Sequence, residues 1–218
     1  MQNTHIVFDL DGTLADTQKI HQKIEANFIK WFWIEISPEE IWKKYAWRSP
    51  QEWIPELLSE NNIDFTQKDI DSFVDSKDEK VVSLLENWEI KLMDWVKELL
   101  EKLHNQWYKI WISSWACREF IDKFISYFNF ENIIEASTSA NEVENKKPYP
   151  DVFQKSFDIL EEKYWKADRK IVVWDGWSDV MWWKWCKAIT IWINTNKPKD
   201  IQILDYQVER IKDIYNLI

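Results

Sequence analysis

The chain has 218 residues, and its 38 acidic and 28 basic side chains give a formal net charge of −10 at pH 7. A hydrophobic content of 45% is sufficient for a globular core of one or two domains, and the acidic balance argues against nucleic acid as the main partner. No apolar run approaches the roughly 18 residues of a membrane helix, and two cysteines are too few for a disulfide framework. We therefore expect a cytoplasmic protein with no membrane partner.

The predicted elements begin with a strand at His5–Phe8, which is followed by a long segment with helical periodicity and no convincing strand. Four helices are expected in that segment, at Thr17–Phe32, Pro38–Tyr45, Gln51–Glu60 and Lys68–Leu85. Ser37 and Pro38 suit the N-cap and first position of the second helix. This pattern predicts an inserted α-helical domain over residues 16–88.

Strands and helices alternate in the rest of the chain. The later strands are expected at Tyr108–Ile112, Ile133–Glu135, Ile171–Val173 and Ala188–Ile193. The helices are expected at Asp94–His104, Arg118–Phe128, Pro150–Lys163 and Asp179–Lys187. This alternation predicts an α/β fold whose core, residues 1–15 and 89–218, is a mainly parallel sheet flanked by helices.

Tryptophan and glycine are present in unusual numbers, 17 and 2, whereas glycine averages about 7% of residues in proteins. Trp107 follows a predicted helix and precedes a predicted strand, which is the usual place of a left-handed glycine. Some bacterial lineages read the codon UGA as glycine, and a translation that reads UGA as tryptophan would write Trp there. We hypothesise that many tryptophans stand for glycine, and that Trp115, Trp174 and Trp183 would be strained or overpacked. The alternative is a genuinely tryptophan-rich protein.

Polar side chains follow three of the predicted strands. They are Asp9 and Asp11, then Ser113 and Ser114, then Asp175 and Asp179. Because the carboxyl ends of parallel strands meet at one edge of a sheet, these side chains are expected to converge there. Several carboxylates with open positions suit a hard cation such as Mg²⁺. An Asx turn after the first strand and N-capping by the last pair are the purely structural alternatives.

The order of these motifs along the chain is specific. The chain contains Asp9-x-Asp11-Gly12-Thr13-Leu14, then Ser114, then Lys147-Pro148-x-Pro150-Asp151, then Asp175-x-x-x-Asp179. This set resembles the four motifs of the haloacid dehalogenase-like hydrolase superfamily over essentially the whole chain. The chain is most similar to the phosphoglycolate phosphatase and β-phosphoglucomutase-like branch, which has a Rossmann-like core and a helical cap between the first two motifs.

The resemblance implies catalytic and metal-binding roles for the carboxylates. Asp9 would attack phosphorus to give an aspartyl-phosphate, and Asp11 would be the general acid and then the general base. Asp9, the main-chain carbonyl of Asp11, Asp175 and Asp179 would hold Mg²⁺, which cancels the repulsion between a carboxylate and a phosphate.

The resemblance also assigns phosphate binding to Thr13, Ser114 and Lys147, with Ser113 as an alternative to Ser114. Lys147 precedes two prolines that stiffen its loop, although a solvated lysine is common in such a loop. Thr13 is typical of the phosphatases, whereas the mutases usually have Val at this position.

Substrate choice would lie in the cap, where Arg48 and His21 are the candidate contacts; a solvent-facing arginine and an exposed histidine are the alternatives. We expect a Mg²⁺-dependent phosphatase, a monomer or weak dimer, that acts on a small phosphorylated metabolite. A β-phosphoglucomutase-like mutase remains an alternative, as does a non-catalytic binding protein if the tryptophans are genuine.

Overall fold

The computed structural model describes residues 3–45, 48–145, 149, 151–176, 187–193 and 204–218. The chain divides into two compact units, one made of Met1–Asp16 and Ile90–Ile218 and the other of Thr17–Glu89. We call them the sheet unit and the helical unit. No helix among the described residues is long and apolar enough to cross a membrane.

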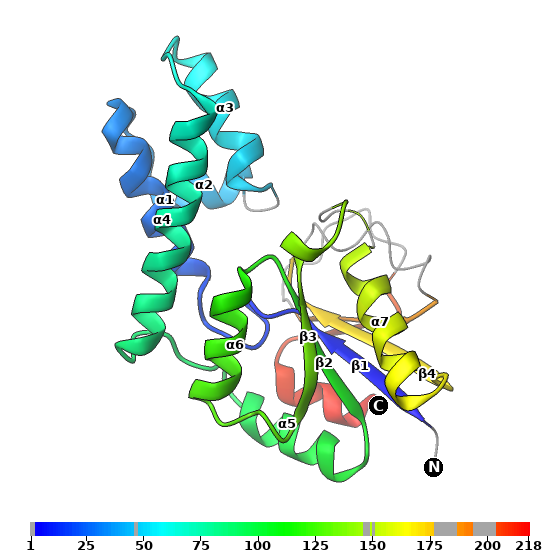
Figure 1. Cartoon of the computed structure of the whole chain (residues 1–218). Helices are drawn as coiled ribbons and strands as arrows, with labels where there is room; N and C mark the ends of the chain where they lie inside the picture. Colours follow the sequence, from blue (N-terminus) through cyan, green and yellow to red (C-terminus); the bar gives the residue numbers. More distant parts are fainter. Residues whose placement is uncertain (1–2, 46–47, 146–148, 150, 177–186, 194–203) are drawn as a thin grey trace. The chain divides into compact units, whose positions relative to one another are not determined.

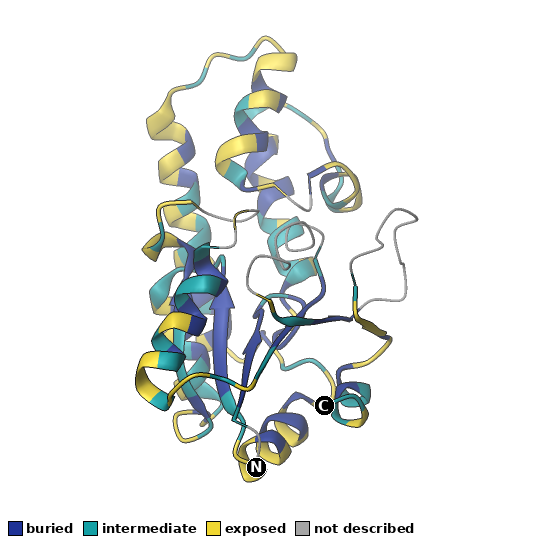
Figure 2. Cartoon of the chain, turned by 90° about the vertical axis from the view of Figure 1, so that its right-hand side faces the viewer, coloured by how far each residue is buried: buried dark blue, intermediate teal, exposed yellow. Residues whose placement is uncertain are grey.

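The sheet unit is built on a six-stranded parallel sheet with the order β3-β2-β1-β4-β5-β6. Its strands are β1 (Thr4–Phe8), β2 (Lys109–Ser114), β3 (Ile134–Ser139), β4 (Arg169–Trp174), β5 (Ile189–Ile193) and β6 (Tyr206–Val208). The central strands are runs of β-branched and apolar residues because both faces of a parallel sheet are buried. Figure 2 shows these strands in dark blue, the colour of buried residues. The predicted α/β fold with a mainly parallel sheet is confirmed.

Helices cover both faces of this sheet (Figure 1). They are α5 (Val96–Asn105), α6 (Arg118–Tyr127) and α7 (Asp151–Tyr164), with short 3₁₀ helices at Ala140–Glu142 and Ile211–Asn216. Helix α7 packs on the face formed by Val7, Trp111 and Val172, and α5 and α6 lie on the other side. The predicted helix at Asp179–Lys187 lies outside the described residues, except for Lys187.

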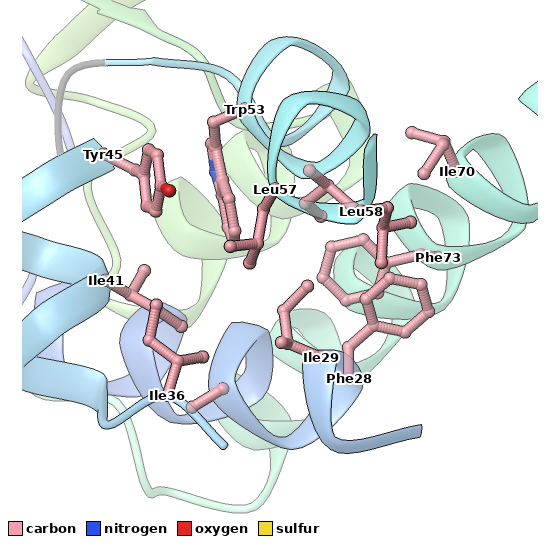
Figure 3. Packing of buried hydrophobic residues seen from close by; sticks show 12 residues of the cluster. Phe28, Ile29, Ile36, Ile41, Tyr45, Trp53, Leu57, Leu58, Ile70 and Phe73 are labelled. Carbon is pink, nitrogen blue, oxygen red and sulfur yellow. The ribbon is translucent and has the colours of Figure 1, made fainter. Parts of the chain in front are cut away.

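The helical unit contains α1 (Gln18–Ile29), a 3₁₀ turn at Lys30–Phe32, α2 (Pro38–Tyr45), α3 (Pro50–Glu60) and α4 (Gln67–Glu86). Its core is aromatic and aliphatic (Figure 3). Phe28 stacks on Phe73 with ring centroids 3.8 Å apart, and Tyr45 stacks on Trp53 at 4.6 Å. Helix α4 begins at a capping box between Thr66 and Asp69, which satisfies amides that would otherwise lack partners.

Backbone with positive φ occurs at eight described residues other than glycine. They are Trp33, Asn62, Trp88, Trp95, Trp107, Asn129, Trp165 and Lys187. Trp107 is among them, as its place after a helix predicted, whereas Trp115 and Trp174 are not, and Trp183 lies outside the described residues. Trp174 is instead fully buried in the core of the sheet unit.

Candidate active site

The turn after β1 brings two aspartates to the carboxyl end of the sheet. Three successive backbone amides, those of residues 13–15, point back to the carbonyl oxygen of Leu10 at 2.9 to 3.3 Å. Gly12 makes this turn with φ of 78°, a value that costs a residue without a side chain little. The chain can therefore reverse within four residues of Asp9 and keep Asp11 and Thr13 at the same edge.

Asp9 and Asp175 follow neighbouring strands. The amide of Asp9 donates to the carbonyl of Val173 at 2.8 Å, which continues the pairing of β1 with β4. The Thr13 hydroxyl donates to the Asp175 carboxylate at 3.1 Å, so the first and last predicted motifs are in direct contact. Both carboxylates are buried, with residue exposures of 7% and 6%. Buried carboxylates are costly unless a cation or several donors compensate their charge.

The structure distinguishes between the two serines at the end of β2. The Ser114 hydroxyl donates to the Asp11 carboxylate at 3.2 Å and accepts from the amide of Ala116 at 3.0 Å. The Ser113 hydroxyl faces α7, where it lies 2.5 Å from the hydroxyl of Ser156. Within the part of the chain that the structure describes, Ser114 is the one of the two candidates that is hydrogen-bonded to another predicted site residue.

The atoms at this edge that could bind a metal ion are all oxygens, which are the ligands that a hard cation such as Mg²⁺ prefers. Asp9 and Asp175 supply buried carboxylates. Among the described residues, no three His, Cys, Asp or Glu side chains are grouped closely enough to form a metal centre by themselves. Asp179 and Lys147 lie outside the described residues. The residues present fit Mg²⁺ in chemistry and burial.

Arg48 and His21, the candidate substrate contacts, lie in the helical unit. Arg48 forms an ion pair with Glu56 at 2.6 Å and donates to the carbonyl of Glu52 at 3.3 Å. The hydrogen bond that Arg48 donates to the Glu56 carboxylate raises the pKa of Arg48 above its ordinary value. Arg48 is exposed and bound to residues of α3, the helix that follows it, and His21 is half-buried on α1.

Sequence reasoning missed a group of buried hydroxyls at the carboxyl end of β3. Ser139 donates to the carbonyl of Ala116 at 2.7 Å, and Thr138 accepts from the Ser156 hydroxyl at 2.9 Å. The predicted strand ended at Glu135, whereas β3 continues to Ser139. A prediction that extended this strand to its observed end would have included Ser139 among the polar side chains at the carboxyl ends of strands.

Comparisons with known proteins identify the family of this chain. Residues 6–188 match the model of the haloacid dehalogenase-like hydrolase family. The chain belongs to this family. The resemblance seen in the motifs is thus confirmed at the level of the family, and the chain is an enzyme. Solved structures of a predicted phosphoglycolate phosphatase and of a putative β-phosphoglucomutase share its fold.

Three relatives illustrate the similarity. Protein CbbY of Rhodobacter capsulatus is 23% identical, over 73% of this chain and 73% of the relative. Pyrophosphatase PpaX of Bacillus cereus is 22% identical, over 83% of this chain and 78% of the relative. The crystal structure of CbbY from Rhodobacter sphaeroides in complex with phosphate is 19% identical, covers 96% of this chain and 95% of its own, and superposes with a TM-score of 0.78.

Proposed function

We propose that this enzyme is a Mg²⁺-dependent phosphatase that hydrolyses a small phosphorylated metabolite through an aspartyl-phosphate. The observation that carries the proposal is the edge of the sheet, where Asp9 and Asp175 are buried and Asp11 is hydrogen-bonded to Ser114. CbbY was solved with phosphate, which supports a phosphoryl group as the ligand of this fold. The full metal set would be Asp9, the Asp11 carbonyl, Asp175 and Asp179.

In the first step, a carboxylate oxygen of Asp9 forms a bond to phosphorus while the bond from phosphorus to the substrate oxygen breaks. The Asp11 carboxyl group gives its proton to the leaving oxygen, and the alcohol departs. Ser114 and Thr13 donate hydrogen bonds, and Lys147 would contribute a positive charge, so that the phosphoryl oxygens stay in place as charge redistributes. A bound Mg²⁺ supplies the positive charge that lets two anions approach each other.

In the second step, Asp11, now a carboxylate, takes a proton from a water molecule whose oxygen attacks the same phosphorus atom. The bond between phosphorus and Asp9 breaks, inorganic phosphate leaves, and Asp11 again holds its proton. Before substrate binds, the hydrogen bond that Ser114 donates to Asp11 keeps the two groups together, and in the reaction the Ser114 hydroxyl donates to the phosphoryl oxygens instead. The candidate contacts for the rest of the substrate are Arg48 and His21.

The test is hydrolysis of p-nitrophenyl phosphate by the purified chain with Mg²⁺ and with EDTA. We expect phosphate release that requires Mg²⁺ and that Asp9→Asn abolishes, whereas Asp122→Asn, a change at an exposed ion pair with Arg118, leaves it intact. Asp9→Asn activity equal to that of the parent would refute the mechanism. A mutase instead would convert a phosphorylated sugar to its isomer without releasing phosphate.

A further inference from the structure

The turn that joins β2 to α6 follows Ser114, and hydrogen bonds hold both the backbone amide and the backbone carbonyl of Ala116 in this turn. The amide of Ala116 donates to the Ser114 hydroxyl at 3.0 Å, and the carbonyl of Ala116 accepts from the Ser139 hydroxyl at 2.7 Å. Ser139 is fully buried and pairs in register with Ser114 on the neighbouring strand. A continuous set of hydrogen bonds therefore connects a core serine of β3 with the Asp11 carboxylate, through Ala116 and Ser114.

The far end of the same turn is also attached to β3. Arg118, the first residue of α6, donates to the carbonyl of Ser137 at 3.0 Å and to its hydroxyl at 2.6 Å. Its guanidinium also forms an ion pair with Glu142 at 2.5 Å. Since β3 holds the turn at both Ala116 and Arg118, the position of Ser114 depends on β3 as well as on its own strand.

We propose that Ser139 is a positioning residue for the phosphate-binding turn, an inference that rests on the proposed phosphatase function. Its hydroxyl holds Ala116 in place, and Ala116 in turn orients the Ser114 hydroxyl toward Asp11. A small displacement of a group that binds the reacting phosphoryl oxygens costs binding and rate, because such groups act only at the correct distance. Without the hydroxyl, the half-buried Ala116 carbonyl would lose this donor, and the turn would move to find another.

The experiment compares the parent with Ser139→Ala in hydrolysis of p-nitrophenyl phosphate and in inhibition by inorganic phosphate. We expect the inhibition constant for phosphate to rise about fivefold to tenfold, which corresponds to one hydrogen bond. Ser156→Ala is the matched control, because Ser156 is equally buried and also bonds a backbone carbonyl, that of Val152, but does not contact the turn. Melting curves of both variants measure the general loss of stability.

A double-mutant cycle with Ser114→Ala separates positioning from stability. If Ser139 acts through Ser114, its removal weakens phosphate inhibition in the parent and has little further effect in the Ser114→Ala background. Equal phosphate inhibition in Ser139→Ala and the parent, or fully additive effects, would overturn the proposal. A parent that neither binds inorganic phosphate nor releases phosphate from any of a panel of phosphorylated metabolites would instead mean that the proposed function itself is wrong, so the two failures are distinguishable.

A second inference comes from an independent observation, the backbone of five tryptophans. Trp33, Trp88, Trp95, Trp107 and Trp165 have φ between 60° and 74°. This left-handed region is an outlier for a bulky side chain and the usual conformation of glycine. The five side chains are also 51% to 95% exposed, so burial of the indole does not offset the strain.

The C-terminal ends of four helices show which backbone conformation the residue after a helix adopts in this protein. At the end of α3, the Asn62 amide donates to Ser59 and the amide of Ile63 donates to Leu58, both at 3.0 Å. At the end of α5, the amide of Trp107 donates to His104 at 2.9 Å and the next amide donates to Leu103 at 3.1 Å. This is the same Schellman arrangement, and it recurs with a tryptophan after α4 and an asparagine after α6. Glycine is favoured at this position and asparagine is the common substitute, whereas tryptophan is neither.

We infer that the natural protein carries glycine at residues 33, 88, 95, 107 and 165, as translation of UGA as glycine would produce. The decisive measurement is peptide mass spectrometry of the protein from its source cells, together with the codons of the gene. We expect glycine masses and UGA codons at the five positions. Tryptophan masses or UGG codons there would overturn the inference.

The melting temperature of the chain that carries these tryptophans provides a second measurement. Trp88→Gly and Trp107→Gly should each raise the melting temperature by about 2–4 °C, because each removes the strain of a left-handed bulky residue. Asn62→Gly, at the same position of another helix, should change it less. Trp53→Gly should lower it, because Trp53 lies buried inside α3 and stacks on Tyr45. Lower melting temperatures for the first two variants would contradict the strain argument.

Discussion

The two units of the molecule bury different kinds of side chain. The sheet unit buries hydroxyls and carboxylates at the carboxyl ends of its strands, including Asp9, Ser114 and Asp175. The core of the helical unit is formed almost entirely by apolar and aromatic contacts such as Phe28 on Phe73. A sheet edge holds polar groups in fixed positions because neighbouring strands constrain each other, and this rigidity suits catalysis. Substitutions in the two units should therefore have separable effects.

The largest expected effect on stability is in the helical unit. Phe73→Ala should reduce the free energy of unfolding by about 3–5 kcal/mol, because it leaves a cavity beside the stacked Phe28 ring. Phe73→Leu, which keeps most of the volume, should cost clearly less. Urea denaturation measures both changes. If the two variants were equally stable, packing would not be the main contribution of Phe73 to the free energy of unfolding.

The next largest effect should be on metal affinity in the sheet unit. Asp175→Asn should raise the Mg²⁺ concentration needed for half-maximal activity by about a hundredfold, or roughly 2.7 kcal/mol, because it removes one carboxylate charge from the site. Asp205→Asn is the control, because Asp205 binds the Thr190 hydroxyl at 2.8 Å and takes no part in the site. Titration of phosphate release with Mg²⁺ measures both, and an unchanged requirement in Asp175→Asn would remove Asp175 from the metal set.

A smaller, pH-dependent effect should arise at the other end of the strands. His5 is fully buried, and neither ring nitrogen has a hydrogen-bond partner among the described residues. Burial lowers its pKa below the ordinary 6.5; nearby Glu161 opposes this shift, and Lys170 and Lys109 add to it. The neutral form is favoured in the folded state, so its contribution to stability is complete above pH 6.5 and is lost as the pH falls below that value.

His5→Phe should remove this part of the acid sensitivity. Melting temperatures of the parent and the variant between pH 7.5 and pH 5 provide the measurement. We expect the parent to lose more stability on acidification than the variant, since the buried carboxylates affect both proteins equally. If the melting temperatures of the two proteins fell in parallel with pH, His5 would not contribute to the acid sensitivity.

The smallest effect on stability should come from Arg48→Ala. The ion pair of Arg48 with Glu56 is exposed to solvent, which screens its charges, so it contributes little to stability. If Arg48 selects the substrate, the variant should keep its melting temperature and its activity on p-nitrophenyl phosphate but change its preference in a panel of phosphorylated metabolites. Glu56→Ala breaks the same ion pair and serves as the control. An unchanged preference would remove Arg48 from substrate recognition.

Much of the fold could be predicted because apolar strands have a strong signal in the sequence. The central strands and the alternation with helices follow from β-branched runs such as Ile171–Val173. The three-residue edge strand β6 was missed, because Tyr206 and Gln207 are exposed and carry little hydrophobic pattern. The extension of β3 to Ser139 was missed for a related reason: its serines and threonine are buried by tertiary hydrogen bonds rather than by hydrophobicity.

The site was partly predictable for a chemical reason. Carboxylates and hydroxyls that follow strands stand out, and the contacts from Thr13 to Asp175 and from Ser114 to Asp11 lie among residues selected in this way. The bond from Ser139 to the Ala116 carbonyl could not be predicted, because a backbone carbonyl carries no sequence signal.

The position of β1 in the sheet has a consequence for the order of folding. Although β1 is the first strand of the chain, it lies in the interior of the sheet and pairs with β2, more than a hundred residues later, and with β4, later still. Such distant pairing makes sheet formation slow. On the ribosome, the segment with Asp9 must wait unpaired until β2 has emerged, and the amide of Asp9 reaches Val173 only after β4 has followed. The residue proposed to begin the chemistry is thus synthesised long before the two strands that fix it in place.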